Sequence, residues 1–191
     1  MPIPTKYLLS RNLYLCVLFL LCVITLSAQS LPTVVGVRFG DNYTSCKRVL
    51  DKRFNGGRDS YQYFTNKLRY DDVSFAGERF DYVDFEFQVE GNATYLYFIC
   101  FVSRFNLSSD EYAKQQRDRL YTVFLQKYEF RWSGTDKDGF KYYIFGHSPN
   151  NREDGFIKIK TLKSETNGGE MKYWTTLSYG PVNFVNPSDE I

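Results

Sequence analysis

Residues 80–89 alternate between apolar and polar side chains, and this two-residue period constrains the fold more than any other feature of the sequence. The apolar positions are Val83, Phe85, Phe87 and Val89, and the positions between them are Tyr82, Asp84, Glu86 and Gln88. Successive side chains of a β-strand point to opposite faces of its sheet. The pattern therefore predicts a strand with one face in the core and the other in solvent.

Residues 67–75 and 95–105 flank this strand across turns at residues 76–78 and 90–92, each of which contains a glycine. Consecutive strands joined by short turns are typical of an antiparallel meander. The stretch 95–105 is apolar at both sets of alternate positions, which predicts a central strand buried on both faces. One set is Leu96, Phe98, Cys100 and Val102, and the other is Tyr95, Tyr97, Ile99 and Phe101.

The segment before this meander has the three- and four-residue spacing of a helix. Its apolar positions are Tyr43, Cys46, Leu50 and Phe54. Asp41 is the expected N-cap, and Gly56 with Gly57 forms the expected end. If the apolar stripe packs on the sheet, Cys46 points into the core.

A second helix is predicted to begin within residues 108–111, where a serine and a glutamate three residues later can form a capping box. It runs to about Tyr128. Its apolar stripe is Tyr112, Leu120, Val123, Phe124 and Tyr128, and its solvent side is Lys114, Arg117, Asp118 and Arg119. Strand-like runs follow at residues 129–133, 140–146, 156–162 and 171–179, separated by turn-forming residues.

The expected fold class is α+β, with an antiparallel sheet built from two helix-plus-meander units and both helices on one face. The sequence supports an internal repeat of residues 33–105 and 106–182, because short matches recur at the end of each helix, 49–54 with 123–128, and in a strand after it, 80–85 with 140–145. In that alignment Val83 and Phe85 correspond to Tyr143 and Phe145, which face inward. Tyr82 then corresponds to Tyr142, which faces outward.

Residues 1–30 have the order of a cleavable export signal. Lys6 and Arg11 precede an apolar run at residues 13–26, and small residues close the segment. The run is shorter than the roughly twenty residues that a spanning helix needs. We therefore expect a periplasmic or secreted domain at residues 31–191, with no transmembrane segment after cleavage.

The charge of the exported part argues against a nucleic-acid partner. The chain has 24 Lys and Arg against 22 Asp and Glu, and loss of Lys6 and Arg11 with the signal leaves 22 of each. Nucleic-acid binding normally requires a basic surface to neutralise phosphates. A net charge of zero removes that support.

Loss of the signal also leaves only Cys46 and Cys100 of the 4 cysteines. In an oxidising compartment this pair allows one disulfide, and two buried free thiols are the alternative. The sequence leaves both open.

One resemblance adds to these observations. The stretch 35–42, VGVRFGDN, the helix after it and the stretch 73–80, VSFAGERF, resemble uncharacterised exported proteins of Bacteroides-type bacteria. The tandem helix-plus-sheet plan is similar to the β-lactamase-inhibitor-protein-like architecture. This resemblance implies helices on one side of a single sheet, an open face on the other, and a binding or assembly role.

Residue patterns for catalysis and for cofactors are weak. His147 is the only histidine and has no accompanying nucleophile motif. Asp84 and Glu86 would share one sheet face at roughly 7 Å, a separation that a glycosidase could use. We expect no metal site and no cofactor, and a cell-envelope hydrolase using these groups is the alternative to a non-enzymatic protein.

Aromatic residues make up 18% of the chain, and they provide the candidate binding surface. Those expected on the sheet face away from the helices are Tyr82, Tyr95, Tyr97, Phe101, Tyr142 and Trp174. Tyr and Trp are enriched at interfaces because they bury a large area at a small entropic cost. The sequence therefore favours a binding module for a protein or glycan partner, with a self-associating envelope protein as a further alternative.

Overall fold

The computed structural model describes residues 31–54, 67–105, 109–165 and 169–184. By its contacts the chain divides into two compact units, Met1–Leu31 and Pro32–Ile191. The predicted export signal at residues 1–30 lies outside the described residues, as do Ser108 of the predicted capping box and the glycines expected to end the first helix.

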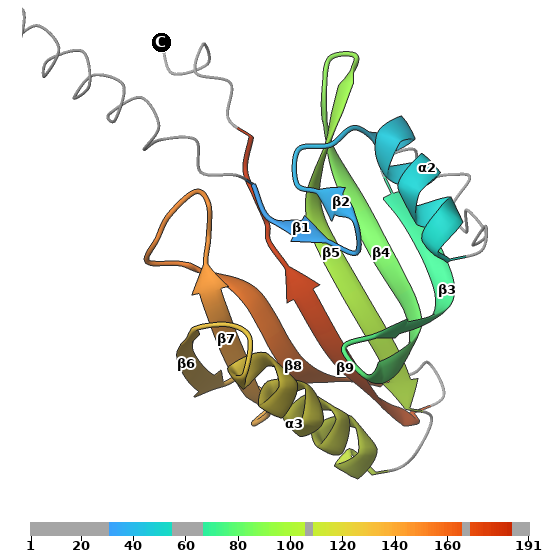
Figure 1. Cartoon of the computed structure of the whole chain (residues 1–191). Helices are drawn as coiled ribbons and strands as arrows, with labels where there is room; N and C mark the ends of the chain where they lie inside the picture. Colours follow the sequence, from blue (N-terminus) through green and yellow to red (C-terminus); the bar gives the residue numbers. More distant parts are fainter. Residues whose placement is uncertain (1–30, 55–66, 106–108, 166–168, 185–191) are drawn as a thin grey trace, which may run out of the picture. The chain divides into compact units, whose positions relative to one another are not determined.

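A seven-stranded sheet forms the centre of the second unit (Figure 1), in the order β3-β4-β5-β9-β8-β7-β6. Its strands are β3 (Lys67–Phe75), β4 (Glu78–Glu90), β5 (Ala93–Phe105), β6 (Phe130–Thr135), β7 (Lys141–His147), β8 (Gly155–Glu165) and β9 (Met171–Tyr179). Every neighbouring pair in it is antiparallel. The predicted α+β class with an antiparallel sheet is confirmed.

A short ladder precedes the sheet, formed by β1 (Thr33–Val34) and β2 (Val37–Arg38). It leads into helix α2 (Tyr43–Arg53), whose N-cap is Asn42, because the Asn42 side-chain oxygen accepts a hydrogen bond from the Ser45 amide at 2.9 Å. The prediction that Asp41 caps the helix is wrong. The Asp41 carboxylate instead accepts from the Arg38 amide at 2.9 Å and so closes the turn before the helix.

Helix α3 (Glu111–Leu125) follows the first three strands of the sheet. Its buried residues are Ala113, Gln116, Arg117, Leu120 and Phe124. The predicted stripe is confirmed at Leu120 and Phe124, whereas Tyr112 is exposed. Arg117, predicted on the solvent side, is buried, since its guanidinium donates to the Lys141 carbonyl and to the Asp118 carboxylate.

Both helices pack on the same face of the sheet, as Figure 1 shows. In α2, Tyr43 contacts Phe87 of β4, with ring centroids 5.3 Å apart. In α3, Tyr121 stacks on Tyr143 of β7 at 4.1 Å, and Thr175 of β9 donates to the Ala113 carbonyl at 2.8 Å. Directly paired residues of adjacent strands point to the same face. The helix-facing side therefore continues across the sheet through three paired positions: Phe85 with Ile99, Ile99 with Tyr179, and Tyr179 with Ile157.

One irregularity changes the faces of β5. Glu86 pairs with Phe98 and Phe87 pairs with Leu96, so Tyr97 is an extra residue in the ladder. Such a β-bulge shifts the two-residue alternation by one. Leu96 therefore lies on the helix side together with Ile99 and Phe101, and the predicted assignment of Leu96 and Phe98 to a common face is wrong.

The orientations expected from the proposed repeat agree with the structure. Val83, Phe85, Tyr143 and Phe145 are buried on the helix side, while Tyr82 and Tyr142 are half-buried on the other side. The duplication itself stays a prediction. Neither helix of the described ranges combines the length and the apolar character that crossing a bilayer would demand.

Candidate functional site: a groove on the open sheet face

The face of the sheet opposite α2 and α3, called the open face below, contains a groove of about 510 Å³. This groove extends from β5 to β6 across the middle of the sheet. Its lining includes Phe98 and Cys100 of β5, Thr176 and Ser178 of β9, Lys158, Lys160 and Leu162 of β8, Ile144 of β7 and Trp132 of β6. The groove lies in the size range of natural ligand pockets.

Gly155, at the start of β8, makes room for the apolar end of the groove. A methyl group at this position would overlap the Ile144 side chain and would lie 3.4 Å from the Trp132 ring. The absence of a side chain therefore lets Ile144 and Trp132 pack over the backbone of β8. Trp132 remains 39% exposed, so its ring is available to a partner.

Lys158 and Lys160 give the groove its positive charge. They occupy alternate positions of β8, opposite Ser178 and Thr176 of β9. Within the described part of the chain, neither amine lies within ion-pair distance of a carboxylate. The Lys158 ammonium lies over the Tyr142 ring, 4.7 Å from its centroid. Burial and, next, repulsion from Lys160 lower the pKa of Lys158.

The other half of the open face carries charges that pair with one another. Arg69 donates two hydrogen bonds to Asp84, at 2.6 and 2.7 Å, and Lys67 bridges Asp84 and Glu86 at 3.5 and 2.7 Å. Tyr97 donates to Glu86 at 3.0 Å. Asp84 is only 6% exposed, so this ion-pair network compensates a carboxylate that would otherwise be buried without a partner.

Five of the six predicted binding residues lie on the open face, but outside the lining of the groove. Tyr82 lies beneath Arg69, 3.8 Å from its guanidinium, and Tyr142 lies over Gly134. Tyr95 packs against Phe184, with centroids 5.6 Å apart, and Trp174 pairs with Leu162. With Tyr97 bonded to Glu86, most of these rings have partners within the chain.

The sixth residue, Phe101, is misplaced by the prediction. It is 0% exposed and lies on the helix side, where it stacks on Phe75 at 4.6 Å. The β-bulge at Tyr97 is the reason, because it reverses the faces of all residues of β5 that follow it. The position expected for Phe101 on the open face is taken by Phe98 and Cys100.

The two cysteines lie on opposite sides of the sheet as free thiols. Cys46 is a buried residue of α2, whereas Cys100 lines the groove on the other side of the sheet. The Cys46–Cys100 disulfide that the sequence allowed is not formed in this structure. Burial raises the pKa of each thiol to about 12. Both are therefore poor nucleophiles near neutral pH.

The groups considered for catalysis do not come together. Asp84 and Glu86 share the open face, as expected, but both are held in the ion-pair network with Lys67 and Arg69. His147 lies at the end of β7, where its ring contacts the Arg152 carbonyl at 2.7 Å and the Glu129 carboxylate at 3.1 Å. Within the described ranges, no group of three or more His, Cys, Asp or Glu side chains is placed to hold a metal ion.

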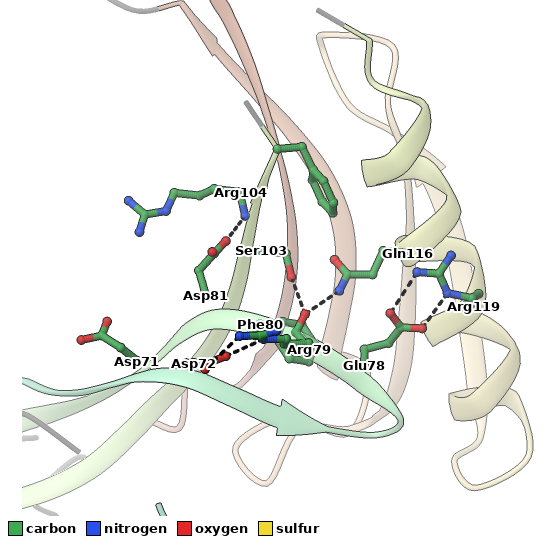
Figure 2. A pocket seen from close by; sticks show the side chains of 11 residues that line it. Asp71, Asp72, Glu78, Arg79, Phe80, Asp81, Ser103, Arg104, Gln116 and Arg119 are labelled. Atoms are coloured by element: carbon green, nitrogen blue, oxygen red, sulfur yellow. Dashed lines mark hydrogen bonds and ion pairs between the residues drawn. The ribbon is translucent and has the colours of Figure 1, made fainter. Parts of the chain in front are cut away.

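A second, larger hollow of about 700 Å³ lies between the β3–β4 hairpin and α3 (Figure 2). Its polar groups largely satisfy one another. Arg79 pairs with Asp72 at 2.6 Å, and Arg119 pairs with Glu78 at 2.7 Å. Ser103 and Gln116 both donate to the Arg79 carbonyl, as Figure 2 shows. We regard this hollow as a weaker candidate than the groove, where two lysines lack a carboxylate partner among the residues that the structure describes.

Sequence reasoning missed the residues that line the groove. Lys158 and Lys160 alternate with Ile157 and Ile159, so the pattern could have placed two adjacent cations on the outer face of a strand. No comparable signal existed for Phe98, because the residues around it are apolar at every position.

Comparisons of this chain with protein-family models, with curated proteins and with solved structures found no match. The function is therefore inferred from the geometry of the groove and its surroundings.

Proposed function

We propose that this chain is an exported, non-enzymatic binding module that holds a segment of a partner protein on the open face of its sheet. The observation that carries the proposal is the groove, in which the rings of Phe98 and Trp132 adjoin two lysines that pair with no carboxylate of the described ranges. Interfaces typically combine aromatic anchors with a few polar groups around them.

A protein segment fits the groove better than a neutral glycan does. The apolar side chains Ile144 and Leu162 continue the surface formed by Phe98 and Trp132. Hydroxyl-rich sugars need many hydrogen-bonding partners, and besides Lys158 and Lys160 the polar side chains of the lining are the three short ones of Asp154, Thr176 and Ser178. Apolar side chains of a partner would bury these surfaces from water.

Export and ancestry belong to the same proposal. The order of residues 1–30 supports delivery to the periplasm or the exterior. The strand order supports descent from a duplicated helix-plus-meander unit, because each helix is followed by consecutive strands that pair in sequence, and the two runs join at β5 and β9. An open face opposite both helices is what the β-lactamase-inhibitor-protein-like resemblance implied.

The non-enzymatic part of the proposal rests on where the ionisable groups lie. Asp84 and Glu86 are engaged by Arg69 and Lys67, and His147 is at a strand end in the other half of the sheet. A general acid and a base need to reach one reacting atom. These three groups do not converge on the groove.

The test is capture of a partner by the purified protein, followed by measurement of its affinity. The protein is immobilised, incubated with an extract of the organism that encodes it, and the captured protein is identified, purified and titrated by calorimetry. We expect the variant Phe98→Ala/Trp132→Ala to weaken binding by more than about tenfold, because it removes the aromatic anchors of the groove.

The matched control is Tyr112→Ala/Leu125→Ala, which removes two exposed apolar side chains of α3 on the other side of the sheet. It should bind as the unaltered protein does. Equal affinity of the groove variant and the control, with thermal stability unchanged in both, would show that the groove is not the binding site.

A further inference from the structure

Two adjacent cations in the centre of the open face, Lys158 and Lys160, have no carboxylate partner in the described residues. From them we infer that the partner segment is acidic: an extended peptide whose carboxylates, two residues apart, bind to these lysines. The inference rests on the proposed function and specifies the chemistry of the partner at the same groove.

The contrast within the open face supports this assignment. Lys67 and Arg69, the cations of β3, are neutralised by Asp84 and Glu86 of the neighbouring strand. Lys158 and Lys160 instead face Ser178 and Thr176 on one side. On the other side, the register places Ile144 and Tyr142 of β7 beside them. Their direct neighbours on the adjacent strands are thus apolar groups and hydroxyls, while the Asp136 carboxylate acts on Lys158 from beyond ion-pair distance.

The surroundings also explain why an anion would be bound well there. Burial and the adjacent Lys160 ammonium lower the pKa of Lys158, which is a sign that charge at this position is poorly compensated. Of the described residues, Asp154 is the one carboxylate that lines the groove, and it is exposed at the loop before β8. A bound carboxylate would therefore restore the balance of charge, and Thr176 could donate a further hydrogen bond to it. The Ser178 hydroxyl, which donates to the Lys158 carbonyl at 3.5 Å, would have to rotate to do the same.

The spacing of the lysines defines the geometry of the segment. Residues i and i+2 of a strand lie on one face, roughly 7 Å apart. An extended peptide has the same period, so two acidic residues separated by one apolar residue match Lys158 and Lys160 in register. Trp132 of β6 and Phe98 of β5 lie to either side of β8, so long apolar side chains of the segment that extend sideways would contact these two rings at the walls of the groove.

The experiment uses two blocked pentapeptides as probes. In the acidic probe, two glutamates alternate with leucine, phenylalanine and leucine; in the neutral probe, both glutamates are replaced by glutamine. Calorimetric titration of the purified full chain should show the acidic probe binding about tenfold more tightly at low salt. Added salt should reduce this difference.

Variants distinguish what the lysine charges contribute to binding from what the rest of the groove contributes. In Lys158→Met/Lys160→Met, the two probes should bind with equal affinity. The control Lys127→Met/Lys137→Met removes two exposed lysines outside the groove and should preserve the tenfold preference.

Equal binding of both probes to the unaltered protein, lost in Phe98→Ala/Trp132→Ala, would overturn the acidic partner and leave the proposed function standing. Failure of both probes, together with binding of dextran sulfate or a fatty acid that depends on Lys158 and Lys160, would overturn the peptide as occupant. Failure of every probe, with the captured partner unaffected by either set of groove variants, would reject the inference and the proposed function together.

Discussion

At the scale of single residues, Lys158 is placed where it does not stabilise the fold. Its amine is partly buried beside Lys160 and over the Tyr142 ring, and no carboxylate of the described residues pairs with it. Residues that bind a partner are often retained at such a cost to stability. This property distinguishes Lys158 from Arg69, which neutralises the buried Asp84.

Replacing Lys158 by methionine should stabilise the protein. A lowered pKa means that the folded chain holds this proton less tightly than the unfolded chain, so the charge destabilises the fold below the folded-state pKa. Lys158→Met removes the charge and keeps the apolar length of the side chain. Scanning calorimetry near neutral pH should show Tm rising by about 1–3 °C.

The pH dependence of Tm checks the sign of the stabilisation expected for Lys158→Met. The difference in Tm between Lys158→Met and the unaltered protein should shrink as the pH rises through the lowered pKa of Lys158. The amine of the unaltered protein then loses its charge. Lys127→Met, at an exposed position, should leave Tm unchanged. A lower Tm for Lys158→Met would mean that the ammonium stabilises the fold through its contact with Tyr142.

Individual site residues were predictable only in part. Tyr82 and Tyr142 follow a regular alternation of polar and apolar positions, and their orientation was correctly predicted. Phe101 was not, because residues 95–101 are apolar or aromatic at every position and give no sign of the extra residue. Burial of Arg117 was also missed, since its carbonyl partner at Lys141 is distant in sequence.

At the scale of elements, the beginning of α2 shows how one side chain fixes a helix end. Asn42 has extended backbone angles, and its side chain accepts from the Ser45 amide. We expect Asn42→Ala to reduce the free energy of unfolding by about 1 kcal/mol, because that amide loses its acceptor. Urea denaturation monitored by circular dichroism measures the change.

Ser45→Ala is the control for the cap, since it leaves the backbone amide and its acceptor in place. Its stability should stay within about 0.5 kcal/mol of the unaltered protein. If Asn42→Ala is as stable as this control, the hydrogen bond from Ser45 contributes nothing to the helix.

The extents of the elements were predicted better than their internal details. Strand β3 has the predicted bounds, and β4 and β5 exceed theirs by one or two residues at an end. Period-two patterns and glycine turns are local signals, which explains this success. The cap of α2 was missed because Asp41 and Asn42 are adjacent and both residue types cap helices well, and only the backbone geometry decides between them.

At the scale of the whole molecule, the sheet separates the two thiols and prevents them from meeting. Cys46 is on the helix side and Cys100 in the groove. We expect the purified protein to carry both as free thiols that react slowly with a thiol reagent when folded and rapidly when denatured. Burial raises the pKa of both to about 12, so little thiolate is present near neutral pH.

A mass spectrum after alkylation in denaturant, without reductant, counts these thiols. In a chain from which residues 1–30, and with them Cys16 and Cys22, have been removed, two alkylated cysteines would agree with the structure. Loss of two protons and no alkylation would instead demonstrate a disulfide, and would require the sheet near Cys100 to rearrange.

The class and layering of the molecule were predictable from the sequence, whereas its binding groove was not. Alternating strands and two amphipathic helices predict helices on one face of an antiparallel sheet. The groove depends on which strands become neighbours: the pairing of β5 with β9 brings Cys100 beside Ser178, one strand away from Lys158. Such long-range pairing has no local signature in this sequence.

The surplus residue at Tyr97 makes β5 tolerant of the loss of one residue at this point. Phe98 pairs with Glu86 and Leu96 pairs with Phe87, so deletion of the codon for Tyr97 would leave both pairs in place as a regular ladder. Phe101 would stay in the interior and Cys100 on the open face, while the hydrogen bond from Tyr97 to Glu86 would be lost. A deletion elsewhere in the paired stretch, where no residue is surplus, would reverse the faces of the residues beyond it.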